Sequence, residues 1–160
     1  MLNLTRAMFG DEGVSENLFL AFTDPTSQKP FMVMCGDMPF DMHLVGAASG
    51  ASGLPLYRFL TDGSRVENIT DWALKQFEKA YGKNKAKPIT KDAIFHYVYG
   101  VLHDPTYREK YAQNLKREFP RLPFYPDFWS WADWGDKLMR LHIGFETVDP
   151  WPLARVERSR

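Results

Sequence analysis

Two aspartates, Asp37 and Asp41, are spaced closely enough along the chain to suggest a pair of metal-binding carboxylates. A metal-dependent nuclease would combine such a pair with further acidic residues and a lysine, because the cation needs several oxygen ligands. The two aspartates flank the residues MPF, and no Glu-x-Lys partner accompanies them. We therefore interpret both aspartates as surface residues of a turn.

The remaining reactive side chains form no recognisable catalytic set. Cys35 is the only cysteine, which excludes an internal disulfide and a thiolate metal cluster, and its apolar neighbours FMVMC predict a small residue in a buried strand. His96 and His103 can share one face of a helix, but without an HExxH pattern we expect them to pack or to form hydrogen bonds. The sequence contains no GxxxxGK[ST] phosphate loop. We therefore predict no catalytic residue, no metal and no cofactor.

Charge is balanced over the whole chain but not along it. Residues 1–62 contain three Lys/Arg and seven Asp/Glu, whereas residues 63–160 contain 17 and 13, which together give 20 of each and a net charge of zero. This is not the profile of a free-standing protein that binds DNA by charge alone. The densest basic group lies in residues 79–91 and consists of Lys79, Lys83, Lys85, Lys87 and Lys91. Such a loop is either simply solvated or lies against phosphates, and both interpretations stay open.

The first part of the chain is predicted to be rich in strands. Residues 17–23 (NLFLAFT) and 31–35 (FMVMC) are short apolar runs joined by DPTSQKP, which predicts a hairpin. Residues 42–45 (MHLV) offer a third strand, followed by the small residues GAASGASG, for which we expect a flexible loop. Residues 56–60 (LYRFL) predict a fourth strand that ends in the turn TDGSR.

After residue 68 the apolar period changes to that of helices. Residues 69–81 predict a helix that Asn68 or Thr70 caps and Gly82 ends. Thr90 begins a second helix, with Ile94, Tyr97 or Val98, Val101 and Leu102 facing inward. Asp104 and Pro105 begin a third helix, which is expected to continue to about Phe119, with Tyr107, Tyr111, Leu115 and Phe119 on one face.

A fourth and longer helix is predicted for residues 127–145. Its expected apolar face comprises Phe128, Trp131, Trp134 or Gly135, Leu138, Leu141 and Ile143. Four large aromatic rings lie within residues 128–134. They could stack on bases, although aromatic residues at helical spacing more often pack in a core or between domains, which is the interpretation we favour. The two prolines of the C-terminal tail predict an extended segment that docks through Trp151.

These elements predict an α+β fold with a β-rich part in residues 1–67 and a helical part of about four helices in residues 68–160, or one continuous domain. The chain has 44% hydrophobic residues and is long enough to bury a core. No apolar run is long enough to cross a bilayer and the N-terminus lacks a signal-peptide core, so we expect a cytoplasmic protein.

Several longer segments carry a family resemblance. The segments LPLYRF, ENITDWAL, IFHYVYGVLHDP, YREKYAQNLKREFPRLPF and KLMRLHIGFE resemble the C-terminal specificity domain of type ISP restriction-modification enzymes and related large DNA adenine methyltransferases. The resemblance runs from about residue 17 to residue 156 and is strongest over residues 54–144. It implies a non-catalytic DNA target-recognition module. It also implies a larger parent with nuclease, helicase-like ATPase and S-adenosylmethionine-dependent methyltransferase parts.

The chain itself lacks the methyltransferase motifs of that parent. Neither an Asn-Pro-Pro-aromatic segment nor the glycine-rich turn for S-adenosylmethionine is present. DNA contacts are instead expected on loops, because base edges and phosphates are reached by Arg, Lys, Asn, Gln and Ser side chains. The expected DNA-binding residues are Ser27, Gln28, Lys29, Arg58, Arg65, Lys83, Lys85 and Lys87, with the GAASGASG loop beside them.

Other classes of function stay open. The chain could be a structural docking domain that contacts the methyltransferase or helicase part of the parent, which its aromatic residues and zero net charge favour. A truncated gene product without independent activity is a related alternative. An autonomous small enzyme is disfavoured, because no mechanism can be assembled from the residues.

Overall fold

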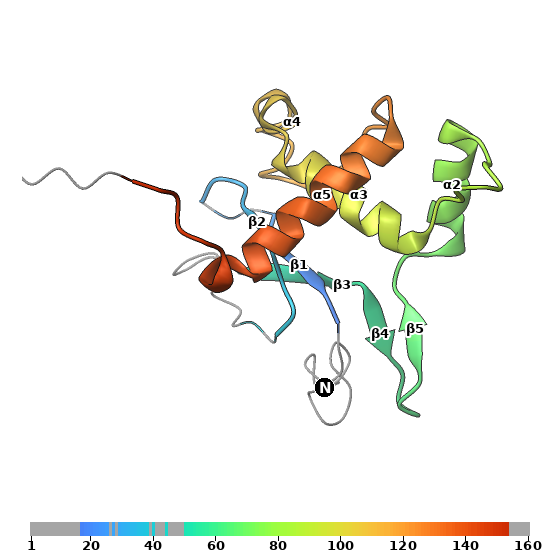
Figure 1. Ribbon diagram of the computed structural model, residues 1–160, viewed down its shortest axis with the longest axis horizontal. Helices are drawn as coiled ribbons and strands as arrows, with labels where there is room; N and C mark the ends of the chain where they lie inside the picture. The colour runs from blue at the N-terminus through green and yellow to red at the C-terminus, as the bar shows by residue number, and fades with distance from the viewer. Residues whose placement is uncertain are drawn as a thin grey trace, which may run out of the picture.

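The computed structural model describes residues 17–25, 27, 29–38, 40, 44 and 50–153. Its strands are β1 (Phe19–Thr23), β2 (Val33–Gly36), β3 (Ala51–Pro55), β4 (Tyr57–Phe59) and β5 (Arg65–Glu67). Its helices are α2 (Asp71–Tyr81), α3 (Lys91–His103), α4 (Pro105–Lys110) and α5 (Phe128–Ile143), followed by the short 3-10 helix η1 (Phe145–Thr147). The strands therefore precede the helices, as the predicted α+β fold requires (Figure 1). None of the helices in these ranges is long and apolar enough to span a membrane.

The first three strands form one antiparallel sheet with β1 in the centre, in the order β2-β1-β3. All five residues of β1 are buried, so this strand is covered on both faces. The predicted hairpin is confirmed, because Leu20 pairs with Cys35 and Phe22 pairs with Val33. Cys35 is only partly buried and its thiol lies 3.8 Å from the carbonyl oxygen of Met139.

The prediction of a loop for the whole of GAASGASG is partly wrong. Its last three residues belong to β3, where Ser52 pairs with Phe22 and Gly53 with Ala21. The small residues of this segment did not predict a strand, because they form no alternating apolar pattern. The strand is stabilised by backbone pairing with β1, which lies far away in the sequence. The third strand predicted at residues 42–45 falls outside the described residues except for Leu44, which lies in a turn.

A second small sheet is the hairpin of β4 and β5, in which Arg58 pairs with Val66. The predicted strand at residues 56–60 and its turn are confirmed, but β5 was missed because its sequence, RVE, has one apolar residue. Two side-chain amides attach this hairpin to the first sheet. Asn17 donates to the carbonyl oxygen of Tyr57 at 2.9 Å and accepts from its N–H at 3.0 Å, and Asn68 donates to the carbonyl oxygen of Pro55 at 2.8 Å.

The predicted starts of α2, α3 and α4 are confirmed by their caps. The hydroxyl groups of Thr70 and Thr90 accept from the N–H groups of the residues three positions later, at 3.2 and 3.1 Å. The Asp104 carboxylate accepts from the N–H of Thr106 at 2.9 Å, and Pro105 occupies the first turn. Because Asn68 is bound to the first sheet, Thr70 is the residue that caps α2.

The centre of the molecule is α3, which is buried on almost every side. Ile94, Tyr97, Val101 and Leu102 face the core as predicted, and Ala93, Phe95, Tyr99 and Gly100 are buried as well. Helix α5 crosses α3 where Gly100 and Gly135 meet (Figure 1). A Cβ atom on Gly100 would lie 2.7 Å from the carbonyl oxygen of Trp131, so the crossing requires a residue without a side chain.

The sheet and the helices share one core. The same hydrophobic cluster contains Leu20 and Phe22 from β1, Ile94 and Val101 from α3, and Met139 from α5. Burying these strands and helices against one another stabilises each of them, since a two-stranded hairpin and single short helices are marginal alone.

The third predicted helix is shorter than expected. It ends at Lys110 and not near Phe119, and the chain continues through irregular turns. Tyr107 and Leu115 are buried as the pattern required, but Phe119 is 58% exposed. The Tyr107 hydroxyl donates to the carbonyl oxygen of Arg121 at 3.0 Å, so the chain folds back over α4 instead of running on as a helix.

The predicted face of α5 is also partly wrong. Phe128, Ala132, Gly135 and Met139 are the buried residues of this helix, whereas Trp134 and Leu141 are 55% and 48% exposed. The helix is apolar over a wider arc than its contact with α3 covers, so the pattern alone did not show where the contact is centred. The expected docking of Trp151 is wrong as well, because this side chain is 81% exposed.

Candidate nucleic-acid interface

The connection between α2 and α3 carries three of the basic residues expected to contact DNA. The Asn84 side chain accepts from the N–H groups of Ala86 and Lys87, at 2.9 and 3.4 Å, which gives the loop a defined turn. The Lys87 ammonium lies 4.0 Å from the centre of the Trp129 ring. Lys83 is 76% exposed and lies 3.0 Å from Glu78. An exposed ion pair of this kind is weak, so Lys83 can exchange its partner for a phosphate at little cost.

Lys91 belongs to the same basic group in sequence but has a different role in the structure. Its ammonium lies 2.7 Å from both Glu67 of β5 and Asp71 of α2, and its side chain is only 13% exposed. The two hydrogen-bonded carboxylates raise the pKa of Lys91, while the ammonium lowers the pKa of Asp71. Lys91 therefore joins three elements of the fold and is not available to phosphates.

The tip of the β1–β2 hairpin is ordered around Ser27. The Ser27 hydroxyl accepts from the N–H of Lys29 at 3.1 Å, and its own N–H donates to the carbonyl oxygen of Asp24 at 3.1 Å. Lys29 is exposed, and Gln28 lies outside the described residues. The Asp24 N–H donates to the carbonyl oxygen of Gly50 at 3.1 Å, so the end of the GAASGASG segment lies beside this tip.

The two arginines of the β4–β5 hairpin do not lie together. Arg58 pairs with Val66 and Arg65 pairs with Phe59, so their side chains leave opposite faces of the hairpin. The Arg65 guanidinium lies 4.3 Å from the centre of the Tyr57 ring, and both arginines are exposed. The turn between the strands is tight, with Gly63 at a φ of 82° and Asp62 accepting from Ser64.

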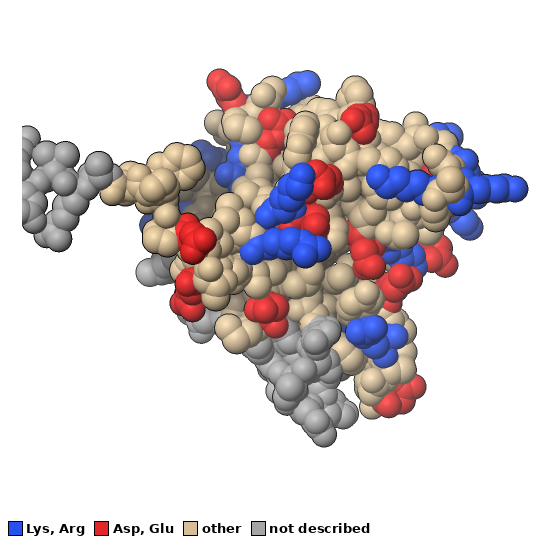
Figure 2. Space-filling view, viewed as in Figure 1, with Lys and Arg blue, Asp and Glu red and all other residues tan. Residues whose placement is uncertain are grey.

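The expected contact residues thus fall into separate groups. The hairpin tip and the end of the GAASGASG segment lie on one side of the molecule, whereas the α2–α3 connection and the β4–β5 hairpin lie on the other (Figure 1). Basic side chains gather over α2 and the connection after it, with acidic side chains next to them (Figure 2). Over α5 the charges alternate, because Lys137 and Arg140 are paired with Asp133 and Asp136.

A cleft of about 540 Å³ between β4, α3 and α5 is the place where a catalytic group would be sought. His96 lies 3.7 Å from Asp136, and burial lowers the pKa of this histidine. Across the cleft the Tyr57 hydroxyl donates to Asp92 at 3.3 Å. Apart from this tyrosine, whose hydroxyl is hydrogen-bonded to Asp92, the described residues that line the cleft include no serine, threonine or cysteine beside His96, so we assign no acid–base–nucleophile set to it.

Two further histidines have structural partners, whereas His43 lies outside the described residues. His103 and His142 have ring centres 5.4 Å apart, and His142 is hydrogen-bonded to the Tyr99 hydroxyl at 2.6 Å. In the described ranges no group of three or more His, Cys, Asp or Glu side chains could hold a metal ion. Asp41, the second member of the carboxylate pair considered above, lies outside these ranges.

Sequence reasoning missed one basic surface. Lys110, Lys116 and Arg117 were interpreted as the polar side of a helix and Arg121 was not considered. Lys110 ends α4, the other three lie on the irregular segment after it, and all four are exposed. Pro120 and Pro123 could have indicated this segment, because prolines mark a turn in the chain. They were a stronger indication than the helical pattern of the residues before them.

Comparison with known proteins identifies the family. The family model of the Type ISP C-terminal specificity domain matches residues 2–160. Among solved structures, a chain in the cryoEM structure of a DrdV–DNA complex is 47% identical with a TM-score of 0.82, and the match covers 92% of this chain and 14% of that chain. No curated protein matches.

A second solved structure is a nuclease-deletion mutant of the Type ISP restriction-modification enzyme LlaGI in complex with a DNA substrate mimic. It is 30% identical with a TM-score of 0.72, and the match covers 92% of this chain and 12% of that chain. The resemblance noted from the sequence is thus confirmed, and the chain belongs to the Type ISP C-terminal specificity domain family. It spans only 14% and 12% of the length of these two relatives.

Proposed function

We propose that this chain recognises the DNA target of a larger restriction-modification enzyme and carries out no chemistry itself. The observation that carries this proposal is its membership of the Type ISP C-terminal specificity domain family, together with the DNA complexes of two similar proteins. The parent would supply S-adenosylmethionine-dependent adenine methylation, DNA cleavage and helicase-like ATPase activity on other parts of the polypeptide. All of this chemistry would take place in the cytoplasm.

The DNA contacts would be divided between phosphates and base edges. Lys83, Lys85 and Lys87 present ammonium groups on an exposed and well-defined loop, which suits contacts to phosphates. Arg58 and Arg65 project from a short hairpin, and arginine is suited to guanine edges in the major groove. Ser27, Gln28 and Lys29 would form a separate contact on the other side of the molecule.

The zero net charge sets a limit on this binding. Nonspecific affinity for DNA comes mainly from the phosphates that a protein neutralises, and acidic side chains lie next to the lysines of this chain (Figure 2). The isolated chain is therefore expected to bind weakly. Other parts of the parent would supply most of the attraction, while this chain would supply selectivity.

Binding to duplex DNA at two salt concentrations tests the proposal directly. If three lysines each neutralise one phosphate, the logarithm of the affinity falls with a slope of about −2.7 against the logarithm of the salt concentration. Between about 50 and 200 mM salt the affinity would then fall by about 40-fold. An affinity that does not change with salt would contradict phosphate contact and hence this proposal.

Target choice is tested in the full-length parent. Exchanging the hairpin tip around Lys29, or residues 83–87, for the same segments of a relative with another target is expected to change which DNA sequence is methylated. The matched control is exchange of Asp133 and Lys137 on α5, two exposed side chains that form an ion pair with each other at 2.7 Å. Unchanged target choice after both loop exchanges would favour the second candidate.

The second candidate is a docking domain for the methyltransferase or helicase part of the parent. A specific feature favours it, namely the exposed apolar side chains on one flank of α5 and beyond its end. Trp134, Leu141 and Phe145 are 55%, 48% and 69% exposed, and they follow one another at helical spacing. An apolar stripe of this kind is typical of a surface that another protein segment covers.

A further inference from the structure

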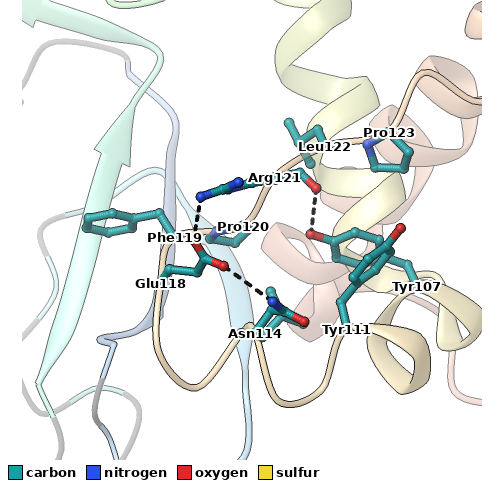
Figure 3. Close-up of a pocket in the computed structure, with 10 residues that line it drawn as sticks. Tyr107, Tyr111, Asn114, Glu118, Phe119, Pro120, Arg121, Leu122 and Pro123 are labelled. Atoms are coloured by element: carbon teal, nitrogen blue, oxygen red, sulfur yellow. Dashed lines mark hydrogen bonds and ion pairs between the residues drawn. The ribbon is translucent and has the colours of Figure 1, made fainter.

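The segment after α4 encloses a cavity of about 370 Å³ (Figure 3). This volume lies within the range of about 300–1,000 Å³ that is usual for sites that bind small molecules. Ten residues line the cavity, all of them from one continuous stretch of chain: Tyr107, Tyr111, Asn114, Leu115, Glu118, Phe119, Pro120, Arg121, Leu122 and Pro123.

Two tyrosine rings form one wall of the cavity (Figure 3). Tyr107 is 1% exposed and is fixed by its hydrogen bond to the carbonyl oxygen of Arg121. Tyr111 is partly exposed, and its ring centre lies 5.1 Å from that of Tyr107. A partly exposed ring held against a buried one is a platform on which a planar ligand can stack.

The polar groups lie beside this platform. Asn114 donates one amide hydrogen to Glu118 at 3.3 Å, and Arg121 donates to the same carboxylate at 2.7 Å (Figure 3). The arginine balances the charge of Glu118. The carbonyl oxygen of the Asn114 side chain accepts no hydrogen bond from the residues that the structure describes, and its second N–H is also free to donate to a ligand.

The surroundings of the cavity are basic. Residues 108–121 contain five Lys/Arg and two Glu. Lys110, Lys116 and Arg117 are exposed on the segment that forms the cavity, and Arg121 is 85% exposed. An anionic group attached to a ring in the cavity would therefore find cations at the rim.

We infer that this cavity binds the base of an unpaired adenine nucleotide in a DNA strand. Tyr111 would stack on the ring, and the rim would hold the phosphates. The Asn114 side chain presents a donor beside an acceptor, the pattern that pairs with N6 and N7 of adenine. A base within a duplex cannot enter a cavity of this shape while both its neighbours stay stacked on it, so the nucleotide must be extruded or single-stranded. This inference rests on the proposed function, and it specifies that the bound DNA includes an unpaired adenine.

The test uses the 160-residue chain with labelled oligo(dA) and oligo(dT) of about eight nucleotides, a length typical of single-strand sites. Fluorescence anisotropy is expected to show tighter binding of oligo(dA). Asn114→Ala is expected to weaken oligo(dA) binding about tenfold, which corresponds to about 1.4 kcal/mol, and to leave oligo(dT) binding nearly unchanged. Gln113→Ala is the matched control, because the neighbouring amide is exposed and does not line the cavity.

Asn114→Leu provides a second variant in case the alanine variant does not fold, since leucine has nearly the same shape and removes the amide without adding a charge. Equal affinities of the wild-type chain for both oligonucleotides would overturn the inference. So would an equal loss for both strands in the Asn114 variants, which would show phosphate contact only. Duplex binding, measured in parallel, separates the two proposals. Salt-dependent duplex binding without a preference for oligo(dA) would refute only the adenine site in the cavity. Absence of both duplex binding and oligo(dA) preference would refute the proposed function as well.

Discussion

Gly135→Ala tests the closest helix contact in the fold. A Cβ atom at this position would overlap the carbonyl oxygen of His96 and would lie 2.7 Å from its carbonyl carbon and 3.0 Å from the backbone nitrogen of Gly100. Alanine in place of glycine in a helix interior gains about 1 kcal/mol from propensity. Overpacking costs about 1–3 kcal/mol and sometimes more, and the cost here is at least about 2–3 kcal/mol because the obstacle is backbone that cannot rotate away. Subtracting the gain of about 1 kcal/mol leaves a net loss of about 1–2 kcal/mol in the free energy of unfolding.

Urea unfolding followed by the fluorescence of the five tryptophans measures this loss. In thermal unfolding, the same loss corresponds to a decrease in Tm of about 2–8 °C for a chain of this size. Lys137→Ala on the exposed side of the same helix is the control, and its effect is expected to stay within about 0.5 kcal/mol. A Gly135→Ala variant as stable as the wild type would refute the reasoning, because α3 and α5 would then not be in backbone contact.

Three further predictions concern a buried hydroxyl, a partly buried histidine and the basic loop. Tyr97→Phe is expected to lower the free energy of unfolding by about 1–3 kcal/mol in urea unfolding. The reason is that the Tyr97 hydroxyl donates to the carbonyl oxygen of Pro123 at 2.7 Å and accepts from the N–H of Tyr125 at 2.8 Å. Tyr57→Phe is the control and should have little effect, because the Tyr57 hydroxyl is exposed. Burial lowers the pKa of His103 below 6.5, so the unfolded chain binds this proton first and the free energy of unfolding should fall as the pH drops below 6.5, by at most about 1.4 kcal/mol per pH unit for this group. His103→Asn should make that decrease shallower, and an unchanged pH profile would contradict the burial effect. Replacing both Lys85 and Lys87 by Ala should reduce the salt slope of duplex binding by about 1.8, and an unchanged slope would remove this loop from the interface.

The elements that the sequence predicted best are those with local causes. Thr90 and Asp104 cap their helices through residues two or three positions away, so the signal and the structure lie in one short stretch of chain. The same holds for the turn at Gly63, where a positive φ is required. In each case the pattern of a few neighbouring residues was sufficient.

The elements that the sequence did not predict depend on distant partners. Strand β3 contains small residues that are held by pairing with β1, about thirty positions earlier in the register that joins Ala21 to Gly53. The end of α4 depends on the hydroxyl of Tyr107 reaching the carbonyl oxygen of Arg121. Neither contact leaves a mark in the local periodicity on which the predictions relied.

The candidate DNA contacts show the same division. Residue types predicted which side chains suit phosphates and bases, but not that Arg58 and Arg65 leave opposite faces of their hairpin. Nor did charge alone separate Lys91, which joins three elements, from Lys87, which lies over a tryptophan ring. The cavity after α4 could not be predicted, because it exists only where the chain returns over itself.

The two amides that attach the β4–β5 hairpin have a consequence for engineering. Asn17 and Asn68 lie outside residues 58–66, and the atoms of Tyr57 and Pro55 to which they bind belong to the backbone. A different sequence of equal length can therefore replace residues 58–66 while the hydrogen bonds that attach the hairpin to the first sheet are kept. New specificities could be sought by grafting at this hairpin without redesigning the scaffold that supports it.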